Sequence, residues 1–125
     1  MSNSTIQNIG LLFFRVSLSV MMLTHGIPKL SKLISGDFEF ASVFGLGAPI
    51  SLGLAVLGEV VFPILIIIGF KTRLSAIPVV CTMAVAAFIY HANDPFGVKE
   101  KALLFLIGFI SIALLGAGRY SVDKK

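Results

Sequence analysis

Four long apolar stretches, separated by more polar segments, dominate the pattern of hydrophobic and polar positions. They cover approximately residues 9–25, 49–70, 74–91 and 102–117. A helix needs about 20 mainly apolar residues to cross a bilayer, within a range of about 17–25. Backbone groups in lipid must also be hydrogen-bonded within the spanning segment. The pattern therefore predicts a single all-α domain over residues 1–125, an integral membrane bundle of four antiparallel helices.

The segments between these stretches indicate how the helices connect. Residues 71–73 read Lys-Thr-Arg, a turn so short that the second and third helices must be antiparallel neighbours. Residues 26–48 form a longer, half-apolar connection. Within it, Asp37 is predicted to cap a short helix that lies in the membrane interface. That helix would carry Phe38, Val43 and Phe44 and end at Gly45-Leu46-Gly47.

The composition favours a membrane protein over a soluble one. Hydrophobic residues make up 57% of the chain and charged residues 13%, whereas soluble domains are about half apolar and a quarter charged. The formal net charge is +4. The basic residues sit at the ends of apolar stretches and form no cluster, so the membrane surface is the expected partner and nucleic acid is not. The single cysteine, Cys81, excludes a disulfide or a cysteine-ligated iron–sulfur cluster within the chain.

The distribution of lysine and arginine predicts the orientation. One end of the predicted bundle carries Lys71, Arg73, Arg119, Lys124 and Lys125, and the other carries Lys29, Lys32, Lys99 and Lys101. Because positive residues concentrate on the cytoplasmic side, both termini are expected in the cytoplasm. Residues 1–9 contain no Lys or Arg, so the first apolar stretch is interpreted as a retained helix and not as a cleaved signal peptide.

Glu59 is an ionisable residue deep within the second apolar stretch. It lies about ten residues into that stretch, at a depth of about 15 Å, where a charge costs about 2.5–3.5 kcal/mol. Ser51, Ala55 and Gly58 share its helical face, and small residues let a second helix approach closely. Glu59 is therefore expected to point into the bundle. Pro63 has no N–H to donate to the Glu59 carbonyl, which adds a second polar atom at this level.

Arg15 interrupts the first apolar stretch and is the predicted partner of Glu59. Two interpretations of this pair stay open. The pair is either a buried ion pair that fixes the register of two helices, or a functional pair in which Glu59 accepts a proton or anchors a ligand. Both residues are therefore candidates for a catalytic role.

Polar side chains gather where three predicted helices reach the non-cytoplasmic end. His25 and Lys29 end the first helix, His91 ends the third, and Glu100 begins the fourth. Helix ends are polar wherever they meet water, and this alone would explain each residue. The two histidines suit a haem or a metal poorly, because no further ligand spacing supports them. A quinone carbonyl that accepts a hydrogen bond from histidine fits better, so these four residues are predicted to bind such a ligand.

A series of short motifs runs in order along nearly the whole chain. The motifs are Arg15, His25-Gly26-Ile27-Pro28-Lys29-Leu30, Gly45-Leu46-Gly47-Ala48-Pro49, Gly58-Glu59, Gly69-Phe70-Lys71-Thr72-Arg73, Glu100, and Gly116-Ala117-Gly118-Arg119-Tyr120-Ser121-Val122-Asp123. In this order and spacing they resemble the DoxX family of small four-helix membrane proteins of bacteria and archaea. The resemblance implies a bacterial inner-membrane location. It also singles out the polar positions Arg15, His25, Lys29, Glu59, Arg73, Glu100 and Arg119, of which Arg73 and Arg119 are interpreted as structural.

The resemblance also bears on activity. A namesake relative is a membrane subunit of a thiosulfate:quinone oxidoreductase, and other members are described as gathering soluble redox enzymes at the membrane. We therefore expect a redox-associated subunit that binds quinone at the outer mouth and is at most the membrane subunit of an oxidoreductase. Two alternatives stay open: a non-catalytic scaffold for soluble redox enzymes, and a small-solute or proton carrier that uses Glu59. A carrier would need a homo-oligomer, which the small residues Ala84 and Ala87 would permit.

Overall fold

The regular secondary structure of the described residues is entirely helical. The computed structural model describes residues 2–40, 42 and 44–124. The helices are α1 (Asn3–Ser35), α2 (Ala48–Val56), α3 (Phe62–Ile68), α4 (Thr72–Val85) and α5 (Phe96–Leu115), with the π-helical turns η1 (Leu57–Val61) and η2 (Ala86–Tyr90). Because η1 joins α2 to α3 and η2 extends α4, the described residues form four helical rods, 3–35, 48–68, 72–90 and 96–115. The predicted all-α fold is confirmed for these residues.

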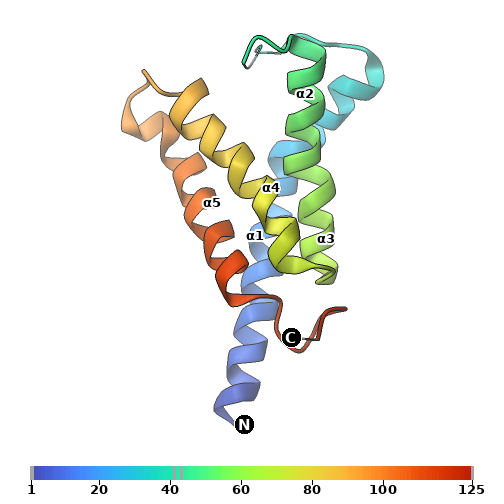
Figure 1. Cartoon of the computed structure of the whole chain (residues 1–125), viewed down its shortest axis with the longest axis vertical. Helices are drawn as coiled ribbons and strands as arrows, with labels where there is room; N and C mark the ends of the chain where they lie inside the picture. Colours follow the sequence, from blue (N-terminus) through green and yellow to red (C-terminus); the bar gives the residue numbers. More distant parts are fainter. Residues whose placement is uncertain (1, 41, 43, 125) are drawn as a thin grey trace.

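The rods run antiparallel between two ends of the molecule. Both termini lie at one end, which we call the terminal end, and the α1–α2 and α4–α5 loops lie at the other, the loop end (Figure 1). Among the described residues, the rods 3–35, 48–68 and 72–90 are long and apolar enough to cross a membrane. The fourth rod, α5, packs along α4 and carries three charged residues near its start, Lys99, Glu100 and Lys101. Towards the loop end, α4 and α5 lean away from α1 and α2 (Figure 1).

The first helix is longer than predicted. The apolar stretch suggested an end near residue 25, but α1 continues through Pro28 to Ser35. The signal that ends it is Gly36, which has a left-handed φ of 79° and whose N–H reaches back to the carbonyl of Leu33. This is the usual glycine stop of a helix. The apolar pattern marked only the part of α1 that is suited to lipid, whereas the helix itself ends at the glycine.

The prediction of a short interfacial helix after α1 is wrong for the described residues. Residues 37–40 and 44–47 form turns, bends and irregular segments without a helix. The carboxylate of Asp37 accepts the backbone N–H of Glu39 at 3.2 Å, a local turn that competes with helix capping. Phe44 has a φ of 54°, which no residue inside a right-handed helix adopts. Val43, which was also assigned to this helix, lies outside the described residues.

The core lies where α1, α3, α4 and α5 meet. Met22, Ile66, Val79 and Phe109 are fully buried there, one from each of these helices. Ala84 packs against the same cluster and Ala87 is also fully buried. The two alanines predicted to allow a homo-oligomer are thus occupied within the single chain.

Two glycines set the closest helix approaches. A Cβ added to Gly26 of α1 would overlap the backbone carbonyl oxygen of Glu59, and a Cβ added to Gly58 would overlap the side chain of Thr82. The η1 turn is therefore held tightly between α1 and α4. Ser51, Ala55, Gly58 and Glu59 are all buried, which confirms the predicted small-residue face of the second rod.

Arg15 does not pair with Glu59, so that prediction is wrong. Arg15 is 2% exposed, and its guanidinium donates to the carbonyls of Ile66 at 3.0 Å, Ala117 at 2.9 Å and Tyr120 at 2.6 Å. The carbonyl of Ile66 belongs to the last turn of α3, where helical partners run out and a cation is favoured. Arg15 therefore stabilises the terminal end of the fold and is remote from the level of Glu59.

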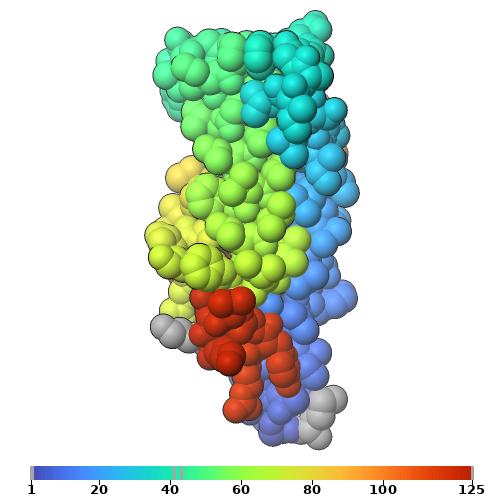
Figure 2. Space-filling model, turned by 90° about the vertical axis from the view of Figure 1, so that its right-hand side faces the viewer, coloured from blue at the N-terminus to red at the C-terminus, as the bar shows by residue number. Residues whose placement is uncertain are grey.

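The residues that follow α5 fold back across the terminal end. Figure 2 shows this segment lying between α1 and the turn that joins α3 to α4. The carboxylate of Asp123 accepts the backbone N–H groups of Lys71 at 2.7 Å and Thr72 at 2.8 Å, so it caps the start of α4 from a distant part of the sequence. The N–H of Asp123 in turn donates to the carbonyl of Gly69 at 2.9 Å. The tail is thus an integral part of the bundle.

Candidate functional site

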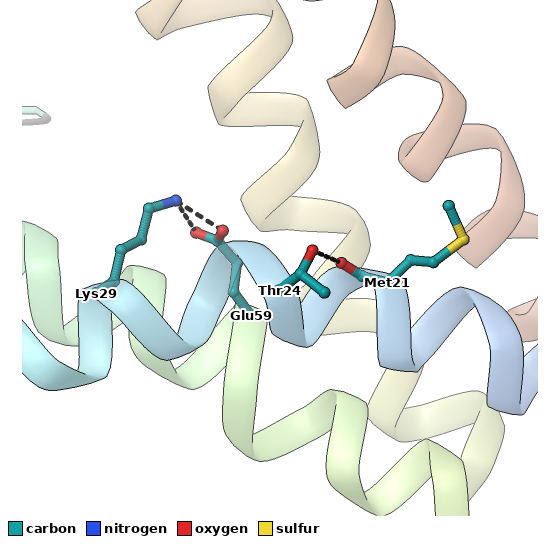
Figure 3. A network of polar contacts seen from close by, with 4 residues as sticks. All are labelled: Met21, Thr24, Lys29 and Glu59. Atoms are coloured by element: carbon teal, nitrogen blue, oxygen red, sulfur yellow. Dashed lines mark hydrogen bonds and ion pairs between the residues drawn. The ribbon is translucent and has the colours of Figure 1, made fainter.

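The partner of Glu59 is Lys29. The Lys29 ammonium lies 2.6 Å from one carboxylate oxygen of Glu59 and 2.7 Å from the other. Figure 3 shows the two side chains reaching toward one another from α1 and η1. The Glu59 side chain is 4% exposed and that of Lys29 is 30% exposed. A carboxylate buried to this degree requires a paired cation, and the extra length of α1 beyond His25 brings that cation into reach.

A π turn in the backbone of the second rod determines the position of the Glu59 carboxylate. The N–H of Phe62 bonds the carbonyl of Leu57, five residues back, which is the spacing of a π turn. Pro63 follows directly, and since it lacks an N–H it cannot donate to the Glu59 carbonyl. A π turn accommodates this loss and inserts an extra residue into the helix. Such turns are frequent at functional sites.

Glu59 and Lys29 line a cavity of about 500 Å³ near the loop end. The cavity lies between the second rod and the third, with Lys29 contributed by α1 and Phe40, Phe44 and Leu46 by the α1–α2 loop. The second rod adds mainly small or aliphatic side chains: Ser51, Leu54, Ala55, Leu57, Gly58 and Phe62. The third rod and the residue after it add Pro78, Cys81, Thr82, Val85, Ala86, Tyr90 and His91. The site is an apolar cavity with one ion pair in its wall.

Both π turns face this cavity. Residues of η1 and of η2 line it from opposite sides, and the N–H of His91 bonds the carbonyl of Ala86 across η2 at 2.9 Å. His91 follows η2 directly. Its Nδ1 lies 2.7 Å from the carboxylate of Asp94, and its ring packs edge-on against Tyr90 at 4.6 Å. The imidazole is thereby held in one orientation at the rim.

The polar groups predicted at one mouth divide into two sets. Lys29 and His91 line the cavity, whereas His25 does not. The His25 ring packs edge-on against Phe105 of α5, with the ring centroids 5.6 Å apart. Glu100 is exposed and does not line the cavity. Of the four residues predicted to bind a ligand, only Lys29 and His91 line this cavity, together with Glu59.

The two arginines interpreted as structural lie at the terminal end. Arg73 donates to the carbonyl of Leu115 at 3.4 Å. Arg119 is exposed, and its backbone N–H donates to the side-chain oxygen of Asn8 at 2.9 Å. Neither side chain lines the cavity.

Sequence reasoning missed several residues of the site. Asp94 orients His91, and the only signal for it was the turn motif Asn93-Asp94-Pro95. Tyr90 and Cys81 also line the cavity, and no local sequence pattern assigns them to a site. The ring of Phe40 lies 5.9 Å from the Lys29 ammonium. Within the described part of the chain, no three His, Cys, Asp or Glu residues lie close enough to hold a metal ion.

Comparison with known proteins decides the family. The DoxX family profile matches residues 10–92, which is more than half of the chain. The chain belongs to the DoxX family. The motifs quoted from the sequence, from Arg15 to the Lys71–Arg73 turn, fall within the matched region.

Bacterial relatives resemble this DoxX protein over nearly its whole length. The inner membrane protein YqjF of Escherichia coli strain K12 is 28% identical over 123 residues, covering 95% of this chain and 93% of the relative. An uncharacterized protein of Haemophilus influenzae is 32% identical over 124 residues, covering 92% and 89%. No solved structure matches the chain. Together with the three helical rods suited to cross a membrane, these relatives identify a multi-pass protein of the bacterial inner membrane.

Proposed function

We propose that this DoxX protein is a redox-associated membrane subunit that binds a quinone in the cavity between the second and third rods. The observation that carries the proposal is the Lys29–Glu59 ion pair in the wall of an otherwise apolar space. A volume of about 500 Å³ falls within the range of small-molecule sites, about 300–1,000 Å³. Such sites are mostly apolar and use a few polar groups to orient their ligand.

The proposed chemistry of the site is hydrogen bonding to a quinone carbonyl. An ammonium group has three N–H donors, and two of those of Lys29 are directed at Glu59. The remaining donor can be directed at a carbonyl in the cavity. His91 donates from Nδ1 to Asp94 at the rim, and in its imidazolium form its Nε2–H would be a second donor. The electrons would come from a soluble oxidoreductase partner, which converts the quinone to a quinol with two electrons and two protons.

The proposal includes a placement in the membrane. In it α5 is the fourth crossing, because it runs antiparallel along α4 and its buried face belongs to the common core. Its charged first turns would then lie in the headgroup region. The terminal end, with Lys71, Arg73 and Arg119, faces the cytoplasm by the distribution of positive residues. The quinone cavity would open near the outer surface.

The test is the quinone content of the purified protein. The wild-type chain, purified in mild detergent from quinone-containing membranes, is extracted with organic solvent, and the extract is quantified by mass spectrometry. The double variant Lys29→Met with Glu59→Gln removes the ion pair without stranding either charge, and it is expected to lose the quinone. Lys32→Met is the matched control, because Lys32 lies on the same helix but bonds the Glu39 carbonyl outside the cavity.

Two results would contradict the proposal. Equal quinone content in the wild type and the double variant would place the ligand elsewhere. Quinone in none of the proteins, including wild type reconstituted with added quinone, would favour the scaffold or the carrier alternative.

A further inference from the structure

The cavity has an apolar mouth on the side of the molecule. We infer that its ligand enters sideways from the bilayer, between α2 and α4, with its polar head at Lys29–Glu59 and its apolar tail passing Leu54, Leu57 and Cys81. This inference rests on the proposed ligand site and adds the route of entry, the orientation and the class of ligand. The class is a membrane-dissolved amphipath whose head accepts hydrogen bonds.

The mouth is marked by residues that both line the cavity and reach the molecular surface. Leu54 is 51% exposed and Leu57 is 44% exposed. Cys81 faces them from α4 and is also exposed. All three belong to rods that are suited to cross a membrane, so the surface they share meets lipid chains. An apolar tail can lie there without displacing water or a polar group.

The helix arrangement leaves this side open. The second and third rods contact each other through η1 and α3, and towards the loop end α4 leans away from α2 (Figure 1). No residue of α5 lines the cavity. The opening therefore lies on the α2–α4 side, opposite the face on which α5 packs against α4.

The loop end offers a less suitable entrance. Three large apolar side chains, Phe40, Phe44 and Leu46, line the cavity from the α1–α2 loop, which lies over that end of the second rod (Figure 2). The ring of Phe40 packs near the Lys29 ammonium, 5.9 Å from its centroid. A water-soluble ligand that entered past this loop would have to cross an apolar group before reaching the buried Glu59 carboxylate. A lipid-dissolved ligand meets apolar surface along its whole path until its head reaches the ion pair.

The charge distribution sets the orientation of the ligand. Glu59 is 4% exposed and marks the deep, polar wall of the cavity, whereas the mouth residues Leu54 and Leu57 carry no polar group. An amphipath that entered tail first would bring its apolar chain against the ion pair and leave its head in lipid, and burial of an unbonded polar head in lipid is unfavourable. Head-first entry places the polar head at the ion pair and leaves the apolar chain in lipid.

Cys81 is the single cysteine of the chain and reports on the mouth directly. A nitroxide attached to Cys81 in the full chain, reconstituted into liposomes, is measured by electron paramagnetic resonance for collisions with oxygen and with a water-soluble nickel chelate. Oxygen concentrates in lipid and the chelate stays in water. We expect frequent collisions with oxygen, few with the chelate, and a loss of oxygen collisions when decyl-benzoquinone is added. Frequent collisions with the chelate would overturn the lateral route.

A matched control separates the mouth from the rest of the lipid-facing surface. Leu114→Cys in a Cys81→Ser background places the nitroxide on α5, where Leu114 is 74% exposed and does not line the cavity. It should show the same preference for oxygen but no response to the quinone. An equal response at both positions would show nonspecific partitioning and overturn the inferred tail position.

Two unlabelled variants test the route separately, because a nitroxide at Cys81 could itself block the mouth. Cys81→Phe narrows the opening and is expected to lower the quinone content, whereas Leu114→Phe leaves it unchanged. If wild-type protein contains quinone but neither Cys81 measurement responds, the lateral route is wrong and the proposed function stands. If wild-type protein contains no quinone under any condition, the proposed function itself fails.

Discussion

Gly26 of α1 lies directly against the backbone carbonyl of Glu59, with no room for a Cβ between them. This contact holds the η1 turn at the distance from which the Glu59 carboxylate meets Lys29, one helical turn further along α1. Close packing and the ion pair therefore depend on the same approach of two helices. A substitution at Gly26 should therefore displace the Glu59 carboxylate relative to Lys29.

Gly26→Ala tests this dependence. The added methyl group must push η1 away from α1, and overpacking of this kind costs about 1–3 kcal/mol. We expect a lower unfolding temperature in detergent and a smaller quinone content. Gly53→Ala is the control, because Gly53 is also helical but a Cβ there meets nothing within 4 Å. If the two variants behaved alike, the close approach at Gly26 would have no special role.

The ion pair should respond unequally to the loss of its two members. Lys29→Met leaves Glu59 as an unpaired charge that is 4% exposed, and stranding a buried charge costs about 3–5 kcal/mol. Glu59→Gln leaves Lys29, which is 30% exposed and whose long side chain can turn toward water, so the loss should be smaller.

Unfolding titrations of the two single variants and the double variant measure this difference. The double variant should be more stable than Lys29→Met alone, because neither charge is stranded in it. Equal destabilisation by the two single changes would contradict the unequal burial of the pair.

Arg15 should be important for folding and unimportant for the ligand. Arg15→Met removes one donor from each of the carbonyls of Ile66, Ala117 and Tyr120. Ile66 keeps the N–H of Gly69, whereas a buried carbonyl left unsatisfied, as at Ala117, costs about 1–3 kcal/mol. Arg15→Lys should rescue little, since one ammonium cannot replace a planar fork with five donors. Arg73→Met, which removes one long contact of an exposed side chain, should be nearly neutral. Thermal unfolding followed by circular dichroism measures all three.

Asp123→Ala should loosen the start of α4. The carboxylate bonds two backbone N–H groups, and loss of such a cap costs about 0.5–2 kcal/mol. Hydrogen exchange at the amides of Lys71 and Thr72 should become faster, whereas exchange in the middle of α4 should change little. Asp37→Ala, at an exposed turn, serves as control. Unchanged protection at both amides would show that the tail is not needed to cap this helix.

The sequence predictions succeeded for features that depend on neighbouring residues and failed for features that depend on contacts between distant parts of the chain. The helices and the shared face of Ser51, Ala55, Gly58 and Glu59 depend on a local period of 3.6 residues, which is readable from one segment. The partner of Glu59 depends on the axial position of α1 relative to the second rod. No local sequence pattern specifies that position. Lys29 was interpreted as a helix-end residue because the apolar stretch stops before it, although the helix does not.

The cavity was beyond the reach of sequence reasoning for a related reason. The two π turns each add a residue to a helical turn, and neither Gly58-Glu59 nor the run Ala86–Tyr90 carries a sequence signal for such a turn. Asp94 was visible as a turn residue, but its contact with His91 depends on the exact path of the loop. Pro63 was the one local clue, since it requires some irregularity in the bonding of the second rod.

The bonds of Arg15 also constrain the order in which the protein can assemble. Two of its acceptors, Ala117 and Tyr120, lie 102 and 105 positions later in the chain. During synthesis the first helix therefore enters the membrane carrying an arginine whose partners have yet to be made. Until they emerge from the ribosome, only part of the guanidinium can be bonded inside the bundle, through Ile66, and the rest must extend toward water or lipid headgroups. A chain that ended before Ala117 would lack both of these acceptors, and Arg15 could not be buried in the same way.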